Sequence, residues 1–215
     1  MYNLTPCQVD RCRNNGQLYM MSSKMNPTRD RILQSTLNLL EAGGGSAVRM
    51  SDIARAAKIS RQALYLHYPN RAELLVATTR YLDEVHDIES KLADSRTAKS
   101  GVERLAAWVE VWGNYIPTVY GVSKALLAIK DSDEEAMLAW NDRMQAVRHG
   151  CAAAVAALKQ DGNLTSDVSE SEATDFLWTL LSVRNWEMLR KDCNWPQRRY
   201  IDVMKAKAAS ALVNR

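Results

Sequence analysis

The residues with the clearest capacity for chemistry are polar and aromatic side chains in one stretch, ISRQALYLHYPNRAEL, at positions 59–74. It places arginines and a glutamine beside two tyrosines and a histidine. Arginine and glutamine form paired hydrogen bonds with base edges, and tyrosine, histidine and arginine reach phosphate oxygens. The stretch therefore indicates recognition of a nucleic acid.

Two short helices are expected to position these side chains. An alanine-rich segment around Ile53 predicts a helix over 50–57, and Ser60 is a suitable N-cap for a second helix over 60–68. The small alanines allow the two helices to cross closely, with Leu64 facing inward. Two short helices joined by a tight turn predict a helix-turn-helix.

Longer helices are expected on both sides of this pair. Apolar residues at three- and four-residue spacing predict a helix over 28–41 that packs against it and ends at a run of three glycines. Pro69 ends the second short helix, and Asn70 can cap a further helix over 71–94. That further helix would link the helix-turn-helix to the rest of the chain.

The outward face of the second short helix carries the side chains that we expect to contact DNA: Arg61, Gln62, Ala63, Tyr65, Leu66 and His67. The guanidinium suits guanine, the amide suits adenine, and the alanine and leucine suit thymine methyl groups. Tyr65 reaches phosphate oxygens, and His67 is either a phosphate contact or a solvent-facing ring. We expect Tyr68 to pack this helix against the next one.

The segment RMSDIARAAKISRQALYLHYPNRAELL, at 49–75, resembles the DNA-binding signature of the TetR (tetracycline-repressor-type) transcriptional regulators. In that family an IA-x-x-A helix, a turn and a helix ending in a Tyr-x-x-aromatic pattern precede a basic residue at a helix start. The matching residues are Ile53-Ala54, Ala57, Ile59-Ser60, Leu64-Tyr65, His67-Tyr68, Asn70-Arg71 and Leu74-Leu75. The resemblance covers residues 28–80 and extends more weakly to the segment NWPQRRY at 194–200.

Three residues depart from the family pattern. Lys58 stands where the family usually has glycine, so we expect a non-glycine residue in the left-handed region there, at a cost of about 1 kcal/mol. Arg49 stands where threonine or serine commonly caps the helix, so either Ser51 takes over the cap or Arg49 contacts a phosphate. Arg71 replaces the more common lysine and is expected to bind a phosphate at the helix start.

The resemblance implies an all-α protein of about nine helices, and the chain divides into three parts. The first part is an arm over 1–25, expected to be flexible because its residues show no period. The resemblance implies the other two, a helix-turn-helix DNA-binding domain over 26–72 and a helical ligand-binding and dimerisation domain over 73–215. Such a protein binds a near-palindromic DNA operator as a homodimer, and a small-molecule effector reorients its two DNA-binding heads. The alternative is a TetR-like protein without a small effector.

No clean strand alternation appears, and the C-terminal two thirds read as helical throughout. We predict helices over these ranges: 99–117, 122–130, 133–160, 169–191 and 197–213. The penultimate helix is apolar on nearly every side, which indicates burial on two faces. We therefore expect the homodimer to form through the last two helices.

Aromatic residues and a methionine in this part are the candidates for an effector cavity: Trp108, Trp112, Tyr115, Trp140, Met144 and Trp178. Most aromatic stripes at helical spacing are core, so only some of these residues need contact an effector. Asn141, Arg143 and His149 can add polar contacts. Glu110 points away from the Trp108 stripe on an ideal helix and is set aside. The lining favours an apolar or aromatic effector.

Composition and charge exclude several other classes. The 215 residues are 47% hydrophobic and 25% charged, as in an ordinary globular protein. No apolar run reaches the roughly 18–20 residues of a membrane span, and the N-terminus lacks a secretory apolar segment, so we expect a cytoplasmic protein. The first 72 residues carry ten basic against four acidic side chains, whereas the remainder is net acidic. A basic end on an acidic body indicates a polyanionic partner.

An enzyme is not expected. No carboxylate pair, glycine-rich phosphate loop or activated nucleophile is evident, and the four cysteines and three histidines show no metal-ligand spacing, so no metal or cofactor is predicted. Cys151 lies on an apolar stripe and fits a core, while a redox pair of Cys7 and Cys12 stays open. The rival interpretation is a helical interaction module that does not bind DNA, in which Arg61 and Gln62 would be inert.

Overall fold

The computed structural model describes residues 26–43 and 48–214, which are 79% helical. Their helices are α2 (Pro27–Ala42), α3 (Met50–Ala56), α4 (Arg61–His67), α5 (Arg71–Val85), α6 (Ile88–Lys91), α7 (Ala93–Arg96), α8 (Gly101–Ile129), α9 (Glu134–Gln160), α10 (Glu170–Leu180), α11 (Val183–Glu187), the π-helical turn η2 (Met188–Asp192) and α12 (Gln197–Leu212). No strand forms within the described ranges, which confirms the all-α prediction. The predicted arm over 1–25 lies outside them.

Side-chain caps set the starts of the N-terminal helices, as the sequence predicts for two of them. Ser60 accepts a hydrogen bond from the Ala63 amide at 3.0 Å and starts α4. Asn70 accepts one from the Glu73 amide at 2.9 Å and starts α5. These local bonds satisfy amides that a helix start leaves free, so the two boundaries follow from the sequence alone.

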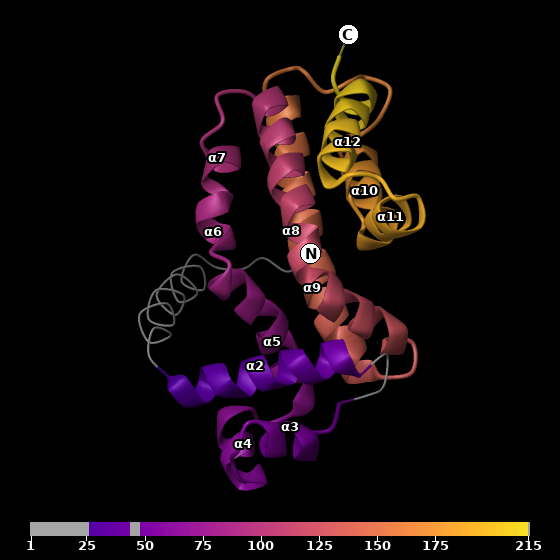
Figure 1. Ribbon diagram of the computed structural model, residues 1–215. Coiled ribbons are helices and arrows are strands. Elements are labelled where there is room, and N and C mark those ends of the chain that lie inside the picture. The colour runs from indigo at the N-terminus through magenta and orange to yellow at the C-terminus, as the bar shows by residue number, and fades with distance from the viewer. Residues whose placement is uncertain (1–25, 44–47, 215) are drawn as a thin grey trace, which may run out of the picture.

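A first hydrophobic core lies between α2, α3, α4 and α5, at the lower end of the molecule in Figure 1. Leu33, Ile53 and Leu64 are fully buried in it. The same core takes in the end of α8, with Leu126, and the start of α9, with Ala139. The helix-turn-helix is therefore packed onto the two long helices of the body.

A second core fills the body, where α8 and α9 run side by side and α10 and α12 pack against them (Figure 1). Val109, Val155 and Leu158 are fully buried here, as is Tyr200 of α12. At 29 and 27 residues, α8 and α9 exceed the length of a bilayer crossing. None of the described helices, however, is both long and apolar enough to span a membrane.

Helix α8 continues through Pro117, so the predicted helix end there and the separate helix over 122–130 are wrong. Proline has no amide hydrogen and leaves the carbonyl four residues earlier, that of Gly113, without its helical partner. Gln197 of α12 donates its Nε2 hydrogen bond to this carbonyl at 2.8 Å. A residue 84 positions away in sequence thus supplies the bond that the proline removes.

The predicted single helix over 169–191 is also wrong, because the chain breaks between α10 and α11. Ser182 starts α11 by accepting a hydrogen bond from the Asn185 amide at 3.2 Å. The Asn185 side chain donates to the Thr179 carbonyl at 2.7 Å, and the Trp112 indole donates to the Leu181 carbonyl at 2.8 Å. Side chains therefore satisfy the carbonyls that the break frees.

The predicted helix over 71–94 is shorter than expected. Helix α5 ends at Val85, and α6 and α7 follow as separate short helices. Asp87 adopts φ 46°, in the left-handed region, which no helix can continue through. Aspartate tolerates this conformation better than most residues, so the break is local in origin.

The passage of α8 through Pro117 makes a testable prediction. Replacing Gln197 with alanine should lower the free energy of unfolding by about 1–3 kcal/mol, because a buried carbonyl loses its donor. In a Pro117→Ala background the Gly113 carbonyl regains a helical amide donor. Replacing Gln197 with alanine should therefore lower the free energy of unfolding by less in this background. Denaturant unfolding of the two single variants and the double variant measures this difference. Equal costs in both backgrounds would contradict the role assigned to Gln197.

Candidate functional site

The turn before α4 adopts the conformation that the sequence predicts. Lys58 has φ 54°, which confirms a non-glycine residue in the left-handed region. The Ile59 amide donates to the Ala54 carbonyl at 3.0 Å and closes the end of α3. The chain then enters α4 at once, so the second helix of the pair is fixed by local hydrogen bonds.

One face of α4 is buried and the opposite face is free. Leu64 is fully buried, and Tyr68 just after the helix is also buried, which confirms it as a packing residue. The centre of the free face is formed by Gln62 and Leu66, one turn apart, and Leu66 is 83% exposed. A leucine this exposed on a short polar helix is a surface feature, not part of the core.

The two flanks of α4 differ. Arg61 and Tyr65 lie on the flank that faces an open groove of about 450 Å³, which Arg49, Ser51 and Arg71 also line. The other flank carries the half-buried Ala63 and, one turn later, His67, which lines a different groove toward α5. Five of the nine candidate DNA contacts therefore surround one groove.

Of the two alternatives for the start of α3, the one in which Ser51 provides the cap does not occur. Arg49 occupies the N-cap position with an extended backbone and no side-chain cap bond, and Ser51 lies within the first turn. Arg49 is exposed beside the groove. The Arg49 side chain makes no capping hydrogen bond, so the phosphate contact is its remaining predicted role.

Arg71 is held by the body of the protein. Its Nη1 donates to Asp133 at 2.9 Å and to Glu135 at 3.0 Å, both at the start of α9, and its Nε donates to the Val48 carbonyl at 2.6 Å. The side chain is only 11% exposed, and Nη2 has no partner among the described residues. Burial lowers the pKa of Arg71, but the hydrogen bonds to the two carboxylates outweigh it and leave the pKa raised.

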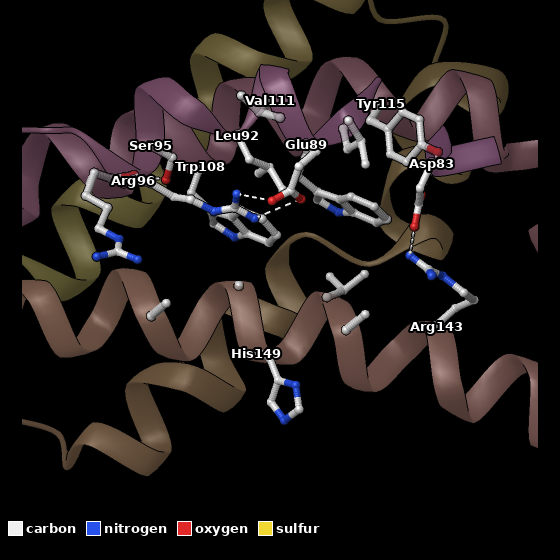
Figure 2. A pocket seen from close by; sticks show the side chains of 17 residues that line it. Asp83, Glu89, Leu92, Ser95, Arg96, Trp108, Val111, Tyr115, Arg143 and His149 are labelled. Carbon is white, nitrogen blue, oxygen red and sulfur yellow. Dashed lines mark hydrogen bonds and ion pairs between the residues drawn. The ribbon is translucent and has the colours of Figure 1, made fainter. Parts of the chain in front are cut away.

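The body contains a cavity of about 390 Å³ bounded by α6, α7, α8 and α9 (Figure 2). Trp108, Trp112 and Tyr115 from α8 line it, and the two indole rings are nearly parallel, with centroids 6.4 Å apart. At one end Asp83 accepts a hydrogen bond from the Tyr115 hydroxyl at 2.7 Å and pairs with Arg143 at 2.6 Å. Burial first, and then the Asp83 charge, raises the pKa of Tyr115.

A second cavity of about 260 Å³ lies on the other side of Trp112, between α8, α9 and the α10–α11 break. Trp140, Met144 and Trp178 line it, together with Trp112. Trp112 is thus a wall of both spaces, held by its hydrogen bond to the Leu181 carbonyl. All six predicted effector contacts line one cavity or the other.

A family model for bacterial regulatory proteins of the tetR family matches residues 32–78. The helix-turn-helix region of the chain therefore matches the DNA-binding domain of the tetR-family regulators. Over 64 residues the chain is 31% identical to the nucleoid occlusion factor SlmA of Marinomonas sp. (strain MWYL1), a match covering 30% of this chain. The matched part spans about a third, 32%, of that relative's length.

Solved structures share the TetR fold over most of the chain. The fatty acid degradation regulator FadR of Bacillus halodurans has a TM-score of 0.69 at 20% identity and covers 90% of this chain and 100% of its own. FadR of Bacillus subtilis in complex with stearoyl-CoA has a TM-score of 0.68 at 15% identity, and the match covers 84% of this chain and 97% of that protein. A transcriptional regulator of Saccharomonospora viridis in complex with choline has a TM-score of 0.67 at 18% identity, and the match covers 87% of this chain and 98% of that protein. At these identities the likeness concerns the fold.

The sequence analysis did not identify several residues of the larger cavity. Asp83, Glu89, Arg96 and Arg104 line the larger cavity, but no motif marks them, since they come from separate helices. Glu110, set aside from the sequence, pairs with Arg198 and Lys205 of α12, away from both cavities.

Further findings concern the cysteines and metal sites. Cys151 is buried, as expected, and burial raises the pKa of its thiol to about 12. Among the described residues no cluster of histidine, cysteine and acidic side chains could hold a metal ion. Cys7 and Cys12 lie outside the described residues.

The ion pairs of Arg71 make a testable prediction about its proposed phosphate contact. Glu135→Gln removes one of its carboxylate partners and leaves Asp133 to cap α9, so Arg71 becomes freer to meet a phosphate. We expect duplex DNA to bind about fivefold more tightly than to Glu134→Gln, measured by fluorescence anisotropy. Glu134 is the matched control, because it has the same charge on the same turn but no ion pair in the described structure. Equal affinities would mean that Arg71 has only a structural role.

Proposed function

We propose that this chain is a transcriptional repressor that binds a near-palindromic operator as a homodimer and is released by a small apolar or aromatic effector. The free face of α4 carries the proposal. Gln62 and Leu66 stand at its centre, where they can meet base edges and a thymine methyl group, and Arg61 flanks them. The groove beside them holds the cations expected to bind phosphates.

Two copies of such a head must be held at a fixed spacing, because successive major grooves on one side of DNA lie roughly 34–36 Å apart. The surface of α10 and η2 supports a dimer through the C-terminal helices. Phe176 of α10 is 42% exposed and Met188 of η2 is 58% exposed, so two large apolar side chains meet solvent here. Exposed Ala206 and Ser210 of α12 are small enough for a partner helix to approach closely.

Two helices can connect an effector cavity to the DNA-binding head. Helix α5 starts at Arg71 in the head and carries Asp83, which lines the larger cavity. Helix α9 starts with the carboxylates that hold Arg71 and lines both cavities along its middle. An effector with different affinity for two positions of these helices would shift the population between two head spacings. The Bacillus subtilis and Saccharomonospora viridis proteins of the same fold are in complex with stearoyl-CoA and choline, which supports the existence of a small-molecule effector but not its chemical class.

The base-reading role of α4 can be tested by footprinting on the DNA upstream of the protein's own gene. Arg61→Ala and Gln62→Ala should each cost about 1–3 kcal/mol of specific binding and relax the preference at particular base pairs. Arg49→Ala is the matched control, because loss of a phosphate contact should weaken binding to all sequences alike. Absence of a specific wild-type footprint at moderate salt would overturn the regulator proposal and favour the interaction module. Persistence of the footprint with a broad panel of apolar compounds would favour a regulator without a small effector.

The dimer surface can be tested separately. Phe176→Glu places a charge in the proposed interface and should convert the dimer to a monomer at micromolar concentration, as measured by light scattering after gel filtration. Leu138→Glu is the control, because Leu138 is similarly exposed, at 48%, but lies on α9 near the head. A Phe176→Glu protein that stays dimeric would exclude this surface as the interface.

A further inference from the structure

The larger body cavity has a defined polarity as well as a shape, and this bears on the chemistry of the effector proposed above. Its walls include Trp108, Trp112, Val147 and Leu92, which present apolar surface. Its volume of about 390 Å³ lies at the small end of the range for organic ligands, about 300–1,000 Å³. A compact ligand with a substantial apolar body fits these dimensions.

The charged side chains around this cavity are mostly paired with one another. Arg143 pairs with Asp83 at 2.6 Å at one end (Figure 2). Arg96 of α7 pairs with Glu89 of α6 through both of its terminal nitrogens. Both carboxylates that line the cavity are therefore neutralised by guanidinium groups of the same cavity.

Arg104 is the exception. It lines the cavity and is half-buried, and its guanidinium has neither a carboxylate partner nor a hydrogen bond among the described residues. The other ionisable side chains of the lining are His149 and Tyr115, and Tyr115 donates its hydroxyl hydrogen bond to Asp83. Neither is hydrogen-bonded to Arg104 in the described structure. The cavity thus has one arginine more than its acids can neutralise.

The position of Arg104 relates this charge to the apolar wall. Arg104, Trp108 and Trp112 follow one another at intervals of four residues on α8, so they lie along one face of the helix. The guanidinium stands at the end of a stripe formed by two nearly parallel indole rings. A complementary ligand is apolar along the stripe and negatively charged at the Arg104 end.

We propose that the larger cavity binds a small organic anion, with its carboxylate on Arg104 and its apolar body against Trp108 and Trp112. Arginine binds a carboxylate through two parallel hydrogen bonds, and the apolar walls strengthen that attraction by limiting water. A cationic ligand finds no free carboxylate, because Asp83 and Glu89 are already paired. This proposal rests on the effector-binding part of the proposed function.

The second cavity provides an internal control. It is also apolar, and Arg184 at its edge is exposed and has no ion pair among the described residues. Replacing Arg184 therefore removes the same charge from the neighbouring space and leaves the larger cavity unchanged. The two arginines together distinguish which cavity the anion occupies.

The test compares three ligands with the same ten-carbon chain: decanoate, decan-1-ol and decylammonium. Calorimetric titration of the full-length protein should give one decanoate per chain, bound at least about tenfold more tightly than either other compound. Arg104→Gln should weaken decanoate about tenfold and leave decanol unchanged, whereas Arg184→Gln should behave as wild type. Thermal unfolding monitored by circular dichroism checks that both variants are folded.

Several outcomes would overturn the proposal. These are equal binding of the three compounds, tighter binding of decylammonium, absence of binding by all three, or loss of the decanoate preference in Arg184→Gln instead of Arg104→Gln. The titration contains no DNA, so its failure is distinguishable from failure of the regulator proposal, which is decided by the footprint and its Arg61 variant.

Discussion

The structure depends on α8 remaining one helix through Pro117. The first turns of α8 build the body core with Leu105 and Val109, and its last turns complete the core beneath the helix-turn-helix with Leu126 and Ile129. A break at the proline would separate these two ends. The helix survives because α12 brings Gln197 to the Gly113 carbonyl, and that carbonyl would otherwise be buried without a donor.

Helices α8 and α9 contribute to both hydrophobic cores, and this determines how the helix-turn-helix is attached to the body. The helix-turn-helix does not stand on a linker, because α8 and α9 contribute directly to its core. Arg71 adds ion pairs with Asp133 and Glu135 at the same place. Because its side chain is largely buried, solvent screens these pairs less than it screens surface ion pairs. The hydrogen bonds to Asp133 and Glu135 fix the position of the Arg71 guanidinium and determine how freely it can meet a phosphate.

Trp112 has a comparable position in the body. Its ring separates two cavities, and its indole hydrogen bond ends on a carbonyl that is free only because α10 stops at Leu180. The break that ends α10 thus helps to shape the cavities. The charges around the larger space come from α5, α6, α7, α8 and α9, so its polarity also depends on how these five elements meet.

The sequence by itself determined the features that local bonds decide. These include the caps at Ser60 and Asn70 and the two short helices of the helix-turn-helix. The left-handed Lys58 and the buried Tyr68 follow from the family resemblance. The predicted boundary between domains at 72 and 73 stays a prediction, since the first core extends into α8 and α9. Predictions about nucleic-acid and effector contacts likewise remain predictions.

Only the tertiary structure decided the continuity of α8, the break after α10, the partners of Arg71 and the lack of an ion pair for Arg104 among the described residues. The first three involve a group far away in the chain: Gln197 for Pro117, Trp112 for Leu181, and Asp133 for Arg71. A proline reads as a helix end when only its neighbours are considered, because its missing hydrogen bond is then unreplaced. Whether a distant side chain replaces that bond, or neutralises a charge, is decided when the helices pack together.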